Sequence, residues 1–236
     1  MNKEDSLREK LLDGHVMLVD KPFRWTSFDV VNKIKSMLRY RLSLKKIKIG
    51  HAGTLDPLAT GLLIICTGKA TKQIDQYQGL DKTYTGTFMM GQVTPSYDLE
   101  TSPEKDLPFR HITPEQIDEA MQQLTGEQQQ LPPIYSAKKI KGERAYHYAR
   151  QGRETTLKTN TIRIKSFEAI RTDLPEVDFR VTCSKGTYIR SLARDLGELL
   201  GCGAYLSALR RTHIGNYSAD NALSMEALIR EFDQFR

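Results

Sequence analysis

The sequence predicts a mixed α/β fold of the α+β type, built as one body with an inserted basic arm. Three observations predict it. Short apolar or alternating segments typical of strands occur along the whole chain, and amphipathic segments typical of helices lie between them. No internal repeat and no low-complexity linker divides the chain. A length of 236 residues suits one large domain or two small ones. We therefore expect a single domain over residues 1–236.

The first half of the chain contains three expected strands and one expected helix. Residues 16–19 are apolar and are followed by Asp-Lys-Pro, which ends a short buried strand. Thr26 opens a capping box and begins a helix, and residues 39–49 then form a basic connector. Residues 62–66 are apolar on both faces and bounded by glycines, as in a central strand. Residues 82–90 are rich in Thr, Tyr and Phe and predict another strand.

The second half of the chain begins with a polar, proline-containing loop over residues 92–112. Thr113 followed by proline is a strong helix start. Residues 161–170 and 177–183 alternate with period two, which predicts two half-buried strands. Two further helices are predicted, over residues 189–200 with Gly201 closing the helix, and after Ser224.

Charge and cysteine content limit the classes of function. Thirty-five Lys and Arg against 29 Asp and Glu give a net charge of +6. This excess favours a polyanionic partner such as nucleic acid, although many basic proteins bind none. Neither a disulfide framework nor a zinc site is indicated, because no CxxC pair is formed by Cys66, Cys183 and Cys202. The charged N-terminus lacks a signal-peptide core, and no apolar run is long enough to span a membrane. We expect a cytoplasmic protein.

The stretch GHAGTLDPLATGLLIICTGKATK, residues 50–72, isolates one carboxylate in basic surroundings. Asp56 is the only acid between Asp29 and Asp75. A Walker phosphate loop is excluded, because six residues instead of four separate its glycines and alanine follows the lysine. A metal site is not indicated either, since hard cations need several oxygen ligands and this stretch supplies one carboxylate.

Two interpretations of Asp56 remain open from these residues alone. Asp before proline often begins a turn and carries no chemistry. Alternatively, Asp56 acts by itself as a nucleophile or general base. Nearby cations would keep it ionised, and Gly50, Gly53 and Gly61 would let a bulky ligand approach the backbone.

The stretch around Asp56 closely resembles the catalytic motif of the TruB-type tRNA pseudouridine synthases. The resemblance is ungapped and extends over nearly the whole chain. It includes VDKPFRWTSFDVV before this stretch and DKTYTG after it, then LPPIYSAKKIKGERAYHYARQG and CSKGTYIRSLARDLGELLGCGAYLSALRRT. It implies the pseudouridine synthase fold, a large and mainly antiparallel mixed sheet flanked by helices and loops.

The resemblance also implies an activity. Uridine 55 in the T-loop of tRNA would be isomerised to pseudouridine without cofactor or metal. The uracil is detached from its ribose, turned and rejoined through a ring carbon. The base must first leave the stack, at a cost of a few kcal/mol. Asp56 inherits the role of the essential aspartate, but the atom that it attacks cannot be read from the sequence.

Other roles follow from the matching motifs. Tyr84 would stack on the flipped base and help to remove the ring proton, and His51 would contact the flipped-out RNA. Without the resemblance, Tyr84 would be an ordinary aromatic residue on a strand, and His51 a turn residue. The uracil pocket would be lined by Tyr188 and Leu209 and supported by Lys21 and Pro22.

Arg190 has independent physical support as a site residue. It falls in the first turn of its helix, where the helix dipole disfavours a cation by about 0.3–1 kcal/mol. A buried carboxylate partner would reverse this penalty. The resemblance implies that Asp56 is that partner, and the alternative is a solvated arginine on the helix surface.

A basic, tyrosine-containing segment follows the helix that begins at Thr113. The resemblance implies an arm over residues 126–153 that grips the T-arm of tRNA, which suits the interleaved aromatic and basic residues. A charge run alone is more often a solvated face. The cations expected to bind RNA are Lys138, Lys139, Lys141, Arg144, Arg150 and Arg153.

The chain departs from the family pattern in two places. Many relatives carry a C-terminal PUA or similar RNA-binding domain, which we do not expect here. Residues 40–49 also look longer than usual. We expect a monomer without an obligatory protein partner. Two alternative functions remain, namely pseudouridylation of another RNA and non-catalytic RNA binding on the same scaffold. An intact Asp56, Tyr84 and Arg190 set argues against the second.

Overall fold

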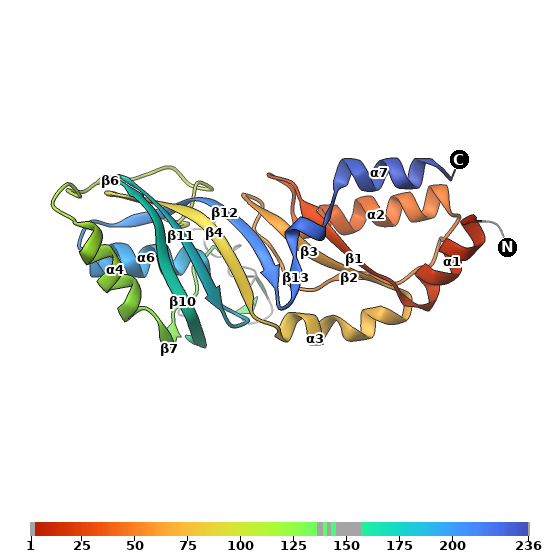
Figure 1. Ribbon diagram of the computed structural model, residues 1–236, viewed down its shortest axis with the longest axis horizontal. Coiled ribbons are helices and arrows are strands. Elements are labelled where there is room, and N and C mark those ends of the chain that lie inside the picture. The colour runs from red at the N-terminus through yellow and green to blue at the C-terminus, as the bar shows by residue number, and fades with distance from the viewer. Residues whose placement is uncertain (1–2, 136–138, 141–142, 145–156, 236) are drawn as a thin grey trace. The chain divides into compact units, whose positions relative to one another are not determined.

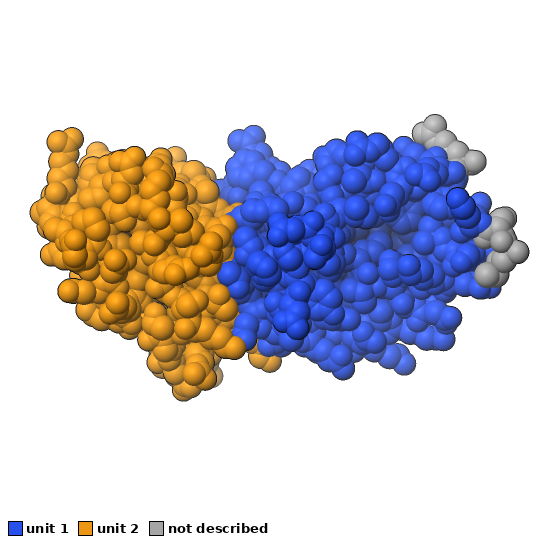
Figure 2. Space-filling model, viewed as in Figure 1, with its two compact units in different colours: residues 1–83, 210–236 blue, residues 84–209 orange. Residues whose placement is uncertain are grey.

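The computed structural model describes residues 3–135, 139–140, 143–144 and 157–235 (Figure 1). The chain divides into two compact units (Figure 2). Unit 1 comprises Met1–Thr83 and Arg210–Arg236, and unit 2 comprises Tyr84–Leu209. Two strands continue along the chain from one unit into the other, β4 (Lys82–Met90) and β12 (Ala204–Ile214).

Unit 1 contains a mixed sheet in the order β14-β1-β3-β12, with β2 on β3 and β13 on β12. The first strand pairs antiparallel with the third, from Val16 opposite Cys66 to Lys21 opposite Gly61. The short last strand runs parallel to the first. The bounds not given above are β1 (Val16–Lys21), β2 (Ile49–His51), β3 (Ala59–Thr67), β13 (Tyr217–Ser218) and β14 (Leu223–Ser224).

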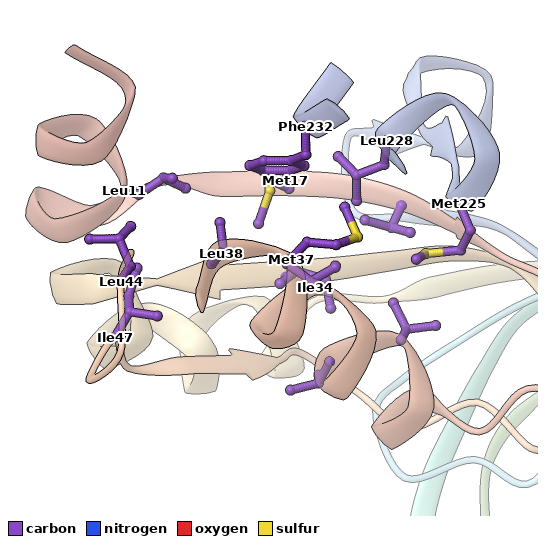
Figure 3. Close-up of a cluster of buried hydrophobic side chains, with 14 of the residues drawn as sticks. Leu11, Met17, Ile34, Met37, Leu38, Leu44, Ile47, Met225, Leu228 and Phe232 are labelled. Atoms are coloured by element: carbon purple, nitrogen blue, oxygen red, sulfur yellow. The ribbon is translucent and has the colours of Figure 1, made fainter. Parts of the chain in front are cut away.

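Helix α2 (Ser27–Arg41) packs its apolar side on this sheet. Thr26 is its N-cap and forms the predicted capping box with Asp29. Figure 3 shows side chains of α2 gathered with those of β1 and of α7, among them Ile34, Met17 and Phe232. The other helical segments of unit 1 are α1 (Lys3–Gly14), η1 (Gly68–Gln73), α3 (Ile74–Gly79), η2 (Ala219–Asn221) and α7 (Met225–Asp233).

Unit 2 contains the sheet order β12-β4-β11-β10-β7. Its core includes Phe88 stacked on Phe179, with ring centroids 3.9 Å apart. The bounds are β5 (Gln92–Val93), β6 (Lys105–Asp106), α4 (Pro114–Gln123), β7 (Gly126–Gln130), β8 (Lys139–Ile140), β9 (Glu143–Arg144), β10 (Asn160–Asp173), β11 (Glu176–Cys183) and α6 (Ile189–Leu199).

The prediction of a mixed α+β fold with helices flanking a mixed sheet is confirmed, and each predicted strand and helix is present. Three segments differ from expectation. The predicted loop over 92–112 contains the short pair β5 and β6. The predicted connector over 39–49 begins inside α2, and Leu44 and Ile47 are buried beyond it. The predicted arm begins with β7, which pairs with β10 as a strand of the sheet. None of the helices in the described part of the chain has both the length and the apolar composition of a membrane span.

Gly61 lies on β3 directly against the backbone of the neighbouring strand β12. Its φ is +105°, and a Cβ atom built there would lie 2.3 Å from the backbone oxygen of Arg211. Neither backbone can move without breaking the sheet. Gly61→Ala is therefore expected to lower the free energy of unfolding by more than about 2 kcal/mol. Chemical denaturation measures this.

Two glycines serve as controls for that substitution. Gly79 has a Cβ position open to solvent, and Gly201 has a φ of +67° with nothing within 4 Å. Gly79→Ala measures the effect of adding a methyl group without a clash or a positive φ. Gly201→Ala adds the backbone strain of a positive φ but no clash. A cost at Gly61 no larger than at Gly201 would contradict the steric argument.

Candidate active-site residues

Asp56 lies on the loop between β2 and β3, in unit 1, and its side chain is half-buried. The Asp56 carbonyl accepts a hydrogen bond from the Ala59 amide at 3.1 Å. Next to it, the Leu55 amide donates to the buried Ser27 Oγ at 2.9 Å. Because Ser27 is the first residue of α2, the helix start and the Asp56 loop are fastened together.

The side chain of Lys21 bonds to the backbone of the same loop. Its side chain is fully buried, and its Nζ donates to the carbonyl of Pro22 at 3.1 Å and to that of Pro57 at 3.3 Å. Burial lowers the pKa of Lys21 from 10.5 to about 8, while the negative charge of Asp56 favours its protonated form. At neutral pH Lys21 is therefore a buried ammonium group that bonds to the loop carrying the Asp56 carboxylate.

Arg211 is a second buried cation of unit 1, with 1% of its surface exposed. Its Nε donates to the Leu62 carbonyl at 2.8 Å, and its Nη2 to the Gly53 carbonyl at 3.1 Å. The left-handed backbone of Gly53, with φ of +96°, directs that carbonyl toward the guanidinium. Arg211 thus fixes the turn that precedes Asp56 to the strand that follows it.

His51 begins this turn and is half-buried. Burial, and after it the charge of Arg211, lower the pKa of His51, so its ring is neutral at pH 7. The backbone of Gly53 only partly offsets this, and within the described ranges the buried Nδ1 has no hydrogen-bond partner of good geometry. At pH 7 the ring therefore adds no charge beside Arg211.

The low pKa of Lys21 predicts a pH dependence of stability. The folded protein releases the Lys21 proton near pH 8 and the unfolded chain near pH 10.5. Raising the pH through this interval therefore favours the folded state, by roughly 1–3 kcal/mol in total. In Lys21→Met this rise is expected to disappear from denaturation curves measured between pH 8 and 10.5. Lys69→Met, which removes an exposed lysine, is the control. A rise of equal size in Lys21→Met and wild type would contradict the assignment.

Arg190 lies in unit 2 at the start of α6, with 4% of its surface exposed. Its Nε lies 3.6 Å from an oxygen of the buried Asp98, and its Nη1 donates to the carbonyls of Tyr135 at 2.8 Å and Ser96 at 3.3 Å. The alternative of a solvated arginine is therefore wrong. A buried carboxylate partner exists, as the helix-dipole argument required, and it is Asp98. The predicted pairing with Asp56 stays a prediction.

The other predicted pocket residues are distributed over both units. Pro22 ends β1 in unit 1. In unit 2, Tyr84 lies on β4 with 8% of its surface exposed, Tyr188 is the N-cap of α6, and Leu209 lies on β12. Gln130 fixes the position of Tyr188, since its Oε1 accepts from the Tyr188 amide at 2.8 Å.

The predicted arm is described only in part. Lys139 and Arg144 lie opposite each other in the antiparallel pair of β8 and β9. The other cations assigned to RNA binding lie outside the described residues, namely Lys138, Lys141, Arg150 and Arg153.

Sequence reasoning missed three residues that position the candidates, namely Ser27, Asp98 and Arg211. Ser27 and Arg211 lie inside quoted motifs, so their places beside other site residues could have been considered. Asp98 falls in a stretch predicted as a loop. Its only signal was an acid within a cluster of turn-forming residues, TPSYD.

Two family models match the chain. The model described as TruB family pseudouridylate synthase, N-terminal domain, matches residues 39–189. The model described as tRNA pseudouridylate synthase B C-terminal domain matches residues 190–234. Together they include most of the candidate residues of both units.

Curated relatives and solved structures agree with these models. The chain is 53% identical to tRNA pseudouridine synthase B of Flavobacterium johnsoniae, over 92% of this chain and 95% of the relative. It is 50% identical to the protein of that name in Phocaeicola vulgatus, over 94% of each. Among solved structures, a chain of a Cbf5-Nop10-Gar1 complex has a TM-score of 0.71 at 28% identity, with 95% of this chain covered. This chain spans only 56% of that longer one.

Proposed function

Because this chain belongs to the TruB family of pseudouridylate synthases, a family of isomerases, we propose that it converts uridine 55 in the T-loop of tRNA to pseudouridine. The single observation that carries the proposal is the Asp56 loop. The backbone of this loop, which carries one carboxylate, is fastened by Ser27, Lys21 and Arg211, which are all buried. The curated relatives bear names that state a tRNA substrate, which supports the choice of RNA.

The proposed chemistry breaks one bond and forms another on the same nucleoside. The bond from C1′ to the uracil nitrogen breaks, and a bond from C1′ to a ring carbon forms. The proton of that ring carbon is removed, and a proton is gained at the freed nitrogen, so the reaction is an isomerisation. Asp56 acts as nucleophile or base at the start of this sequence.

Each remaining candidate has a role in this proposal. Arg190 pairs with the carboxylate of Asp56 through its planar guanidinium. Tyr84 stacks on the extruded uracil and helps to remove the ring proton. Lys21 and Pro22 support the pocket from β1. His51 contacts the flipped-out RNA, and Tyr188 and Leu209 line the space for the uracil ring.

The basic arm completes the proposal. The cations of residues 138–153 bind backbone phosphates of the T-arm, and the tyrosines between them stack on bases. The protein acts in the cytoplasm and needs no obligatory partner. It is a monomer, and light scattering of the purified protein tests this oligomeric state. The solved relative named above lies in a complex with Nop10 and Gar1, and that composition belongs to the relative.

The experiment uses purified protein and three RNAs, namely an unmodified tRNA transcript, its isolated T-arm hairpin and an unrelated hairpin with a uridine-containing loop. Pseudouridine is mapped at nucleotide resolution. Product at the T-loop uridine of the first two RNAs is expected. Product only elsewhere would favour the alternative of another RNA substrate. Tight binding without any product would favour the non-catalytic alternative.

A further inference from the structure

The segment from Pro22 to Asp29 is bonded directly to the Asp56 loop. The Arg24 amide donates to the Pro57 carbonyl at 2.8 Å. The Lys21 Nζ joins the Pro22 and Pro57 carbonyls, and Ser27 Oγ accepts from the Leu55 amide. The backbone of this segment is therefore held at a fixed position beside Asp56, within unit 1.

Two phenylalanines on this segment are exposed to solvent. Phe23 is 53% exposed and Phe28 is 66% exposed. Phe28 lies in the first turn of α2, and the opposite side of that helix is buried in the core shown in Figure 3. The helix cannot rotate to hide Phe28 without exposing that core. Solvated aromatic rings at fixed positions are suited to stacking on nucleic-acid bases.

Arg24 between them has an unfavourable backbone conformation. Its φ is +66°, in the left-handed region that favours glycine and costs other residues about 1 kcal/mol or more. Its guanidinium carbon lies 5.6 Å from the centre of the Phe23 ring, on the protein surface. A strained, exposed arginine stacked on an exposed ring indicates that the side chain has a use outside the fold.

The charge of this surface fits a polyanion. Asp29 is the only acid between residues 22 and 49, and its carboxylate is engaged by Thr26 in the capping box. Beyond it, the exposed charged residues of α2 and the following loop are all cations, namely Lys33, Lys35, Arg39, Lys45, Lys46 and Lys48. Arg41 is instead neutralised by Asp233 at 2.7 Å.

We propose that Phe23, Arg24 and Phe28 form a stacking site for unpaired nucleotides of the substrate RNA next to the target uridine. The proposal rests on the function proposed above and extends it to a specificity site. Each phenylalanine takes the face of one base, and Arg24 pairs with a backbone phosphate between them. The α2 cations nearest to this segment, Lys33 and Lys35, continue the phosphate contacts.

Three substitutions test this site, with RNA affinity measured on an Asp56→Asn background so that the RNA stays unconverted. Phe23→Ala and Phe28→Ala are each expected to weaken binding of the T-arm hairpin by roughly 5- to 50-fold. Arg24→Gly removes the cation while relieving the backbone strain. It is expected to weaken binding by about 5-fold or more and to leave the melting temperature unchanged or raised. In the otherwise wild-type enzyme, KM rises and kcat changes little.

Tyr40→Ala is the matched control. Tyr40 is 74% exposed and lies under Arg39, with 5.5 Å from guanidinium carbon to ring centre, but it is at the far end of α2. Twelve residues of helix place it about 18 Å from Phe28 along the helix axis. Its substitution is expected to change hairpin affinity by less than about 2-fold.

An abasic scan of the hairpin loop identifies the stacked bases. For each phenylalanine there should be one loop position, other than the target uridine, whose base removal weakens wild-type binding and abolishes the further effect of the alanine variant. The proposal would be overturned if base removal and alanine substitution weakened binding independently of each other at every loop position. Unchanged affinity in all three variants would overturn it as well. If the hairpin is converted normally while these tests fail, only the stacking site is wrong. If wild type converts no RNA, the proposed function is wrong, and the affinity tests still decide on the site.

Discussion

Asparagine in place of Asp56 is expected to lower the rate of pseudouridine formation by roughly four orders of magnitude or more. The substitution keeps the shape of the side chain and removes its charge, so the nucleophile or base is lost while the loop stays in place. Ser27 and Lys21 bond to backbone atoms of this loop, and those bonds do not depend on the carboxylate. Affinity for the T-arm hairpin should therefore remain within about 3-fold of wild type.

Two further variants serve as controls for this result. Asp75 is the next acid along the chain and is exposed on α3, so Asp75→Asn should leave the rate unchanged. Asp56→Glu keeps the charge but moves it by one methylene, and it should also lose most activity because the loop is held rigidly. Single-turnover pseudouridine formation is the measurement. A rate within 10-fold of wild type in Asp56→Asn would contradict the assignment.

Lysine in place of Arg190 is expected to lower the same rate by about 10²- to 10³-fold. The guanidinium already contacts the carboxylate of Asp98 through Nε and two carbonyls through Nη1. The planar guanidinium can hold these contacts and still pair with the carboxylate of Asp56, as proposed above. The ammonium group of a lysine, on its flexible chain, cannot do both. Because lysine keeps the buried positive charge, the free energy of unfolding should fall by no more than about 2 kcal/mol.

Asp98→Asn separates a catalytic role of Arg190 from a structural one. If Arg190 served only to anchor the turn around Asp98, then both substitutions would cost the same activity at the same loss of stability. We expect instead that Asp98→Asn retains at least about 10-fold more activity than Arg190→Lys. Equal losses in the two variants would remove Arg190 from the reaction.

Local patterns predicted the elements well where a residue type has one strong physical preference. The capping box at Thr26, the proline after Thr113 and the glycine after α6 marked helix ends correctly. Several short elements were missed, and so were one longer helix and one longer strand. Helix α1 has mixed charges and a single fully buried residue, Leu11, so its sequence shows little periodicity. Strand β12 contains LRRTH, which reads as polar, because the contacts of its arginines are made far away in the chain.

The same reason limited prediction of the site. Asp56 was singled out because one acid in a basic stretch is a local signal, and the resemblance then predicted its catalytic role. Two residues that fasten its loop were not predicted, since Arg211 bonds to the Leu62 carbonyl and Ser27 to the Leu55 amide across long sequence separations. Likewise the resemblance predicted Asp56 as the carboxylate partner of Arg190, and the partner that the structure shows is Asp98. A buried polar contact depends on the fold, and a single sequence does not record it.

The measurement that tests the central claim most directly uses a T-arm hairpin in which only the target uridine carries isotopic label in both its base and its ribose. After incubation with the purified protein, nucleosides are analysed by mass spectrometry. Doubly labelled pseudouridine is expected with wild type, and none with Asp56→Asn. Separation of the two labels, unlabelled pseudouridine alone, or doubly labelled product formed by Asp56→Asn would contradict an isomerisation driven by this one carboxylate.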